Sequence, residues 1–301
     1  MVLLDGSKVN KKGIVVGVTG GNGFIGKKII DRLSDEGIKV ISLQKINTSF
    51  AKCETRFFDL SRLDTINKEL LNDINVVVHT AALVHKNKSK KGLYKLMNTD
   101  ATAKLYDLSV ALEINKFIFL STVGVYGKTS YTSPIDIEFP TSPDTEYGYS
   151  KLQSENYLLN NINKNKGTKI SILRIPLVTG KNAPGNYGLL EKFSKIILPL
   201  PFGCANNKRT VISVEMLVDI VIQACKDIEL HQGLNLIGDN KPLSTKDLII
   251  NLREDKGLKP NFISVPKSLM KFCLLIIGKR KVYEQLFEDL IFIDSIKRNK
   301  N

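Results

Sequence analysis

Short apolar runs alternate with helix-length amphipathic stretches over the first 120 residues, and this alternation limits the fold more than any other feature of the chain. The apolar runs are GIVVGV at 13–18, IKVISL at 38–43, NVVVHTA at 75–81 and KFIFLS at 116–121. Continuous runs of Val, Ile and Phe are typical of strands that are buried on both faces. We therefore predict an α/β fold, with a doubly wound parallel sheet covered by helices on both sides.

The spacing of these segments divides the chain into four parts. We expect an N-terminal tail over 1–12 and a dinucleotide-binding domain over 13–180, which includes a helix from about 146 to 161 and the strand KISILRI at 169–175. A smaller α/β substrate lobe should occupy 181–294, although some of its segments can return to the first domain. Residues 295–301 form a C-terminal tail.

Composition excludes several classes of protein. The 301 residues are 43% hydrophobic and 25% charged, which is typical of a soluble globular chain. The net charge of +14 comes from lysines spread along the chain without an arginine-rich run, so we do not expect nucleic-acid binding. The four cysteines and three histidines lack the spacing of a metal site or a disulfide framework, and no apolar leader precedes the first strand. We expect a cytoplasmic protein without metal.

The run MKFCLLIIG at 270–278 is the most apolar helical segment and is flanked by lysines and an arginine. It is too short to span a bilayer. We favour a core or interface helix here, and the alternative is a peripheral contact with an anionic membrane surface.

A glycine-rich turn, TGGNGFIG at 19–26, directly follows the first expected strand and opens the first expected helix. Gly20 permits the tight turn, Gly23 lets the backbone approach a pyrophosphate, and Gly26 lets the helix pack closely on the sheet. Free N–H groups at the start of the helix would face the anion. This context predicts a dinucleotide site.

The second expected strand ends in Gln44 and Lys45, where an acidic residue would normally bind the adenosine ribose of NAD. Two interpretations stay open. Either these residues only begin a polar loop, or Lys45 attracts the 2′-phosphate of NADP, which a carboxylate would repel.

Tyr147 and Lys151 are spaced to share one face of a helix. A neighbouring ammonium should lower the pKa of the phenol and make it an efficient acid or base. Thr122 ends another expected strand, where its hydroxyl would point into the crevice that holds the dinucleotide. Together with the glycine-rich turn, these three residues predict a catalytic site rather than ordinary helix and cap residues.

These motifs resemble the extended short-chain dehydrogenase/reductase family of nucleotide-sugar epimerases, dehydratases and reductases, over nearly the whole chain. The matching segments are TGGNGFIG, FFDL at 57–60, HTAA at 79–82, MNTDAT at 97–102, STVGVYG at 121–127, YGYSK at 147–151, LRIP at 173–176 and KRTVISV at 208–214. The resemblance assigns catalysis to Thr122, Tyr147 and Lys151, and substrate binding to Thr122, Tyr147 and Arg209. Arg209 would bind the nucleotide diphosphate. The alternative is that it is a surface arginine without a ligand.

The resemblance also implies the cofactor, NADP(H) or NAD(H), and the residues that bind it. These residues are Gly20, Gly23, Phe24, Ile25, Gly26, Gln44, Lys45, Asp59, Leu60, Ala81, Ala82, Asn98, Tyr147, Lys151 and Pro176.

The activity that the resemblance implies is an oxidoreduction at C4 of a UDP-sugar. Segments such as PLPFG at 199–203 and VYEQLFEDL at 282–290 are similar to reductases of 4-keto-6-deoxy UDP-N-acetylhexosamines in surface-polysaccharide synthesis. The alternatives are a UDP-glucose or UDP-N-acetylglucosamine 4-epimerase with bound NAD, and a catalytically idle NADP-binding sensor protein. A homodimer is compatible with each of them.

Overall fold

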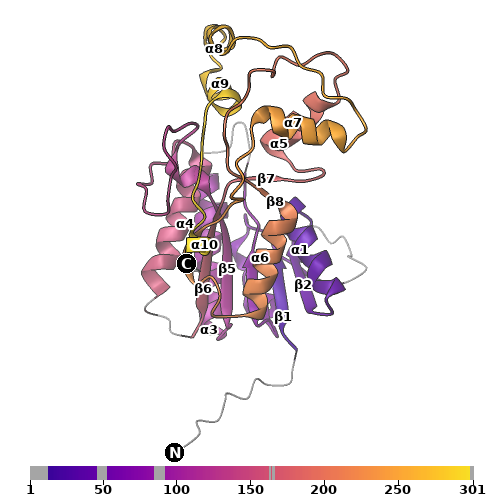
Figure 1. Ribbon diagram of the computed structural model, residues 1–301. Coiled ribbons are helices and arrows are strands. Elements are labelled where there is room, and N and C mark those ends of the chain that lie inside the picture. The colour runs from indigo at the N-terminus through magenta and orange to yellow at the C-terminus, as the bar shows by residue number, and fades with distance from the viewer. Residues whose placement is uncertain (1–12, 46–52, 85–91, 163, 165–166, 299–301) are drawn as a thin grey trace, which may run out of the picture.

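A computed structural model describes residues 13–45, 53–84, 92–162, 164 and 167–298, and it contains one central parallel sheet with a helical lobe above its carboxyl edge (Figure 1). The sheet has the order β3-β2-β1-β4-β5-β6-β9, and every neighbouring pair is parallel. Its strands are β1 (Val15–Thr19), β2 (Lys39–Gln44), β3 (Glu54–Phe57), β4 (Val76–His79), β5 (Lys116–Thr122), β6 (Lys169–Ile175) and β9 (Gly233–Leu236). The doubly wound fold class is confirmed.

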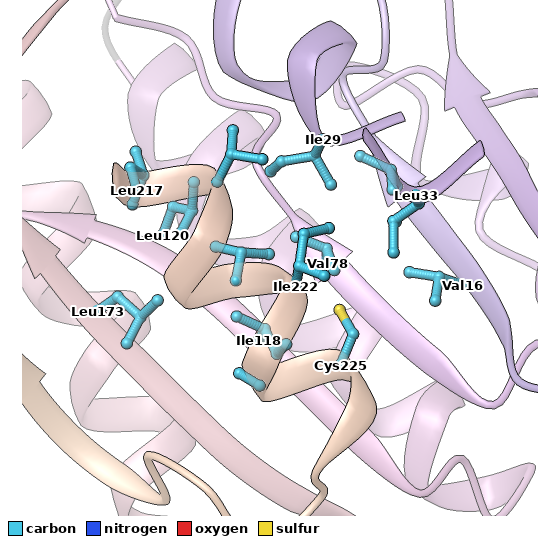
Figure 2. Close-up of a cluster of buried hydrophobic side chains, with 14 of the residues drawn as sticks. Val16, Ile29, Leu33, Val78, Ile118, Leu120, Leu173, Leu217, Ile222 and Cys225 are labelled. Carbon is cyan, nitrogen blue, oxygen red and sulfur yellow. The ribbon is translucent and has the colours of Figure 1, made fainter. Parts of the chain in front are cut away.

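Helices cover both faces of the sheet. The helices of the structure are α1 (Phe24–Asp35), α2 (Lys68–Leu71), α3 (Ala101–Ala111), α4 (Glu146–Ile162), α5 (Gly185–Ser194), α6 (Val214–Lys226), α7 (Thr245–Glu254), α8 (Lys267–Ile276), α9 (Arg280–Phe287) and α10 (Ser295–Arg298). One face packs against α1 and α6, and the other against α3 and α4. Figure 2 shows the first of these layers, where Ile29 and Leu33 of α1 meet Leu217 and Ile222 of α6 over the sheet.

The all-apolar strands explain this two-sided core. Val16 and Val18 of β1 point into the layer of α1 and α6, whereas Ile41 and Leu43 of β2 belong to the opposite layer. Because successive side chains of a strand point to opposite faces, a strand buried on both faces needs apolar residues without interruption. The five expected strands are found at β1, β2, β4, β5 and β6, with boundaries shifted by at most two residues.

The chain beyond residue 180 contributes to both parts of the molecule. Its lobe holds α5, α7, α8, α9 and a core that includes Tyr187, Phe202 and Phe287, and β8 (Val211–Ser213) pairs there with β7 (Leu177–Thr179). In contrast, α6 and β9 return to the sheet, where β9 forms an edge beside β6. The boundary expected at residue 180 stays a prediction, and so do the two tails.

The apolar helix α8 is not a core helix, so that part of the expectation is wrong for this chain, whereas the expectation of an interface helix stays a prediction. None of its residues is buried, and Phe272 and Ile276 are 63% and 69% exposed. In the part of the chain that the structure describes, no helix is long and apolar enough to cross a bilayer.

A buried ion pair fastens α4 to the sheet. The Arg174 guanidinium on β6 binds the Glu155 carboxylate on α4 through Nε and Nη2, at 2.8–3.2 Å, and its Nη1 donates to the Tyr126 hydroxyl at 2.9 Å. The Ser121 hydroxyl donates to the same carboxylate. Glu155 is fully buried, so its charge depends on these partners.

We predict that Arg174→Leu lowers the free energy of unfolding by about 3–5 kcal/mol, because it leaves a buried carboxylate without its cation. The double variant Arg174→Leu/Glu155→Leu should recover part of that loss. Urea denaturation of both variants measures the difference. Equal stabilities for the single and double variants would show that the cost does not come from an unpaired Glu155 carboxylate.

Candidate functional site

Two neighbouring cavities lie at the carboxyl edge of the sheet. The first, of about 370 Å³, is bordered by the glycine-rich turn, and the second, of about 420 Å³, lies between Thr122 and the lobe. Ligand sites of parallel α/β sheets form at this edge, where the strands end and the connecting loops begin. The two cavities therefore coincide with the region where the expected cofactor and substrate residues should meet.

The first cavity collects eleven of the expected cofactor residues. They are Gly20, Gly23, Phe24, Ile25, Gly26, Gln44, Lys45, Asp59, Leu60, Ala81 and Ala82. Four further expected residues, Asn98, Tyr147, Lys151 and Pro176, do not line it, and Pro176 lines the second cavity instead. Residues that the sequence analysis missed here include Asn22, Phe58 and Pro184. Asn22 lies inside the motif itself, whereas Pro184 comes from the distant lobe and carried no signal.

The glycine-rich turn has the shape of a cradle for a phosphate group. A Cβ on Gly26 would lie 2.3 Å from the carbonyl oxygen of Gly20, and Gly20 itself has a φ of +68°. The N-cap residue of α1, Gly23, has no side chain that could accept a hydrogen bond from the first turn of the helix. The free N–H groups of this turn are therefore available to an anion in the cavity. These residues fit the pyrophosphate of a dinucleotide.

The ribose end of this cavity contains an ion pair. The Lys45 ammonium lies 2.8 Å from the Asp59 carboxylate, which is 5% exposed. Burial alone would raise the pKa of Asp59, but Lys45 and Ser61 outweigh it and the pKa is lowered. Lys45, expected as a cation for a 2′-phosphate, is thus held by Asp59. A 2′-phosphate would have to compete with this carboxylate.

A buried chain of hydrogen bonds joins the glycine-rich turn to the helix before α3. His79 Nδ1 lies 2.8 Å from the Thr19 hydroxyl, and Nε2 lies 2.9 Å from the Thr102 hydroxyl. Burial lowers the pKa of His79 to about 3, so the ring is neutral. Thr19 accepts from the Ala81 N–H and Thr102 donates to the Asn98 carbonyl, which assigns the ring proton to Nε2.

Asn98 then links this chain to α4. Its side chain accepts from the Leu83 N–H and donates to the Leu83 carbonyl and to the Ser150 hydroxyl, at 2.8–3.0 Å. The Ser150 hydroxyl donates to the carbonyl of Tyr147. Asn98 is 1% exposed and occurs in a π-helical turn, Lys95–Asp100, a form that is frequent at functional sites. In this structure Asn98 connects the turn Lys95–Asp100 to α4, and its expected role in cofactor binding stays a prediction.

Close backbone packing brings the start of α4, which carries Tyr147 and Lys151, against the loop after β5, although neither of these two residues lines either cavity. A Cβ on Gly148 would lie 2.8 Å from the Gly124 carbonyl oxygen, so glycine is needed where α4 meets the loop after β5. Thr122 lines the second cavity, and its oxygen accepts from the Gly124 N–H at 3.0 Å, which leaves its O–H available to donate. Tyr147 immediately precedes the contact at Gly148. The sequence analysis did not single out Gly148, although it stands inside the YGYSK motif.

The charge state of Tyr147 and Lys151 differs from the expectation. The Lys151 ammonium lies 4.0 Å from the centre of the Phe119 ring, and burial lowers its pKa to about 7 while Glu155 opposes that shift. Burial raises the pKa of Tyr147 to about 12. The expected lowering of the phenol pKa by Lys151 is therefore wrong for this structure, because loss of hydration dominates. Tyr147 is a neutral phenol that can donate a proton.

Arg209 lines the second cavity from the lobe side. Its Nη1 donates to the carbonyl oxygens of Thr129 and Glu288 at 3.0–3.1 Å, and burial lowers its pKa to about 10. Among the described residues, none forms an ion pair with this guanidinium. A half-buried cation without a carboxylate partner is a suitable binding group for an anionic ligand.

Together, the parallel sheet and the phosphate cradle at its carboxyl edge are typical of a dinucleotide-dependent enzyme. The chain belongs to the NAD dependent epimerase/dehydratase family, whose model matches residues 16–235. This confirms the resemblance to the extended short-chain dehydrogenases and reductases, and with it a nicotinamide cofactor.

Similar proteins cover most of the chain. The UDP-glucose 4-epimerase of Vibrio cholerae is 26% identical over 89% of this chain and 84% of its own length. The dTDP-4-dehydro-6-deoxyglucose reductase of Escherichia coli is 28% identical over 79% and 80%. Among solved structures, UDP-glucose 4-epimerase of Thermotoga maritima with UDP-glucose matches with a TM-score of 0.72 at 20% identity, covering 95% of this chain and 92% of that one.

We predict that Lys151→Met changes the pH dependence of stability. The pKa of Lys151 is lowered from 10.5 to about 7 by folding, so the unfolded chain binds more protons between these pH values and stability rises with pH. From pH 7 to pH 9 the wild type should gain about 2 kcal/mol relative to the variant. Denaturant titration of both proteins at the two pH values measures this. If the free energies of unfolding of the two proteins changed equally with pH, the pKa of Lys151 would not be lowered by folding.

Proposed function

We propose that the protein is an NAD(P)-dependent oxidoreductase that acts at C4 of a UDP-sugar, and that it reduces the 4-keto group of a UDP-N-acetyl-6-deoxyhexosamine in surface-polysaccharide synthesis, in the cytoplasm. The observation that carries this proposal is the half-buried guanidinium of Arg209 in the same cavity as the Thr122 hydroxyl. The cavity thus offers a cation for a diphosphate at its lobe side and a hydroxyl for a sugar oxygen at its sheet side. Relatives named as 4-epimerases and as a reductase act on nucleotide sugars, which supports the same substrate class.

The neutral phenol of Tyr147 supports the reductive direction. When bound, the reduced nicotinamide supplies the hydride for C4. Tyr147 donates a proton to the carbonyl oxygen as negative charge develops there, and the Thr122 O–H holds the same oxygen by a hydrogen bond. A phenol with a pKa of about 12 is protonated at neutral pH and is ready for this role. Oxidation, which an epimerase must perform first, needs a proton acceptor instead.

One observation favours the alternative, a UDP-sugar 4-epimerase with bound NAD. Lys45 is paired with Asp59, so the cation that would attract the 2′-phosphate of NADP is already neutralised. An epimerase regenerates its cofactor in each cycle and profits from holding NAD tightly. A reductase consumes one reduced cofactor per turnover and must release it.

Assays with purified protein separate the two activities. The proposal expects oxidation of added NADPH or NADH with a UDP-4-keto-6-deoxyhexosamine, with one reduced sugar formed per cofactor. Tightly bound NAD in the purified protein, together with interconversion of two UDP-sugars without added cofactor, would establish the epimerase. Absence of both reactions, with dinucleotide binding intact, would support the idle sensor protein.

We expect Tyr147→Phe to keep dinucleotide binding and to lower kcat by a factor of roughly 100 to 10,000, because general acids contribute about that much. Thr122→Ala should have a smaller effect, since it removes one hydrogen bond. Single-turnover kinetics and dinucleotide titration measure the two properties. A kcat near that of the wild type would show that Tyr147 is not the proton donor.

We expect Arg209→Gln to raise KM for the nucleotide sugar about tenfold or more and to leave kcat nearly unchanged, because the diphosphate is remote from C4 and contributes uniform binding. The neighbouring exposed Lys208→Gln is the matched control, since its side chain does not line the cavity. Steady-state kinetics give both constants. An unchanged KM would place the diphosphate elsewhere.

A further inference from the structure

Helix α8 exposes an apolar face that the described residues leave uncovered. Leu269, Phe272 and Ile276 lie at helical spacing on one face and are 51–69% exposed, and Leu275 and Ile277 beside them are also exposed. On the opposite side, Met270 and Leu274 pack against the core of the lobe. A helix that is apolar on both sides is normally buried on both sides. Something outside the described chain should therefore cover this face.

The charge around the face identifies the covering partner. From Lys256 to Tyr283 the sequence has no acidic residue, whereas it has seven basic ones: Lys256, Lys259, Lys267, Lys271, Lys279, Arg280 and Lys281. Arg280 and Lys281 form ion pairs with Glu284 and Asp144. In the described part of the chain, Lys267, Lys271 and Lys279 form none. The apolar face is thus bordered by positive charge that no carboxylate of the described residues neutralises at Lys267, Lys271 and Lys279.

We propose that α8 docks this enzyme on an anionic lipid surface, with Leu269, Phe272 and Ile276 inserted at the level of the headgroups. A short helix with an apolar face and flanking lysines binds a membrane interface without spanning it, which agrees with its ten residues. Basic side chains beside the bilayer add attraction to negatively charged lipids. A symmetric contact with a second copy fits less well, because it would bring two acid-free segments of the same charge together.

The location of α8 leaves the active site open during such docking. Figure 1 shows α8 at the tip of the lobe, on the side away from the sheet. None of Leu269, Phe272 and Ile276 lines either cavity at the carboxyl edge. Binding to a lipid surface and binding of a nucleotide sugar can therefore occur at the same time.

Sedimentation with vesicles tests the proposal. The full chain should bind vesicles of phosphatidylcholine with about one third phosphatidylglycerol at least about fivefold more than pure phosphatidylcholine vesicles, and high salt should remove most of this difference. Phe272→Ser/Ile276→Ser should reduce binding to the anionic vesicles about tenfold, because it removes two inserted side chains. Lys271→Gln/Lys279→Gln should reduce the preference for anionic lipid.

Phe57→Ser is the matched control, since Phe57 is 51% exposed on β3, at the far edge of the sheet, and should not change vesicle binding. Thermal unfolding of every variant separates loss of binding from loss of folding. Equal sedimentation with both vesicle types would overturn the proposal, as would an unchanged affinity of Phe272→Ser/Ile276→Ser. A lipid-independent dimer that this variant dissociates would instead assign the face to a second copy of the chain.

Discussion

The buried hydrogen bonds of His79 hold the glycine-rich turn in register with the helices that lead to α4. One ring nitrogen contacts Thr19 at the end of β1, where the glycine-rich turn begins, and the other contacts Thr102 in the first turn of α3. Asn98 continues the connection to Ser150, within the YGYSK motif. Each group in this chain has a donor and an acceptor, so the connection is specific in direction as well as in distance. The phosphate cradle and α4 are thus positioned by the same polar network.

Around this network the site buries charge that the protein does not fully compensate. Lys151 lies over an aromatic ring, and Arg209 contacts only carbonyl oxygens among its described hydrogen-bond partners. Their pKa values fall to about 7 and about 10 because burial removes hydration. Such groups lower stability in the free protein, and a bound anion relieves that cost. The glycines at 26 and 148 complete the arrangement by allowing backbones to approach where a Cβ would collide.

Sequence patterns predicted the parts of this structure that depend on neighbouring residues. The continuous apolar strands and the turn at 19–26 are local features, and eleven of the residues proposed for the cofactor line one cavity. The pairing of Lys45 with Asp59 was not predictable, because it depends on how β2 and the chain after β3 are placed side by side. The shifts in Tyr147 and Lys151 also depend on burial, which the spacing of two residues does not reveal. The exposure of α8 was not predictable for a similar reason: an apolar sequence alone predicts burial, and only the tertiary structure shows which helices are covered.

The last strand of the sheet, β9, pairs with β6 after more than fifty intervening residues that belong largely to the lobe and to α6. During synthesis the chain therefore carries an unpaired edge on β6 until residues 233–236 are available. An exposed edge of a parallel sheet is a template for association with other chains, and slow long-range pairing prolongs that exposure. Between the synthesis of β6 and that of β9, the nascent protein is therefore exposed to association with other chains through this edge.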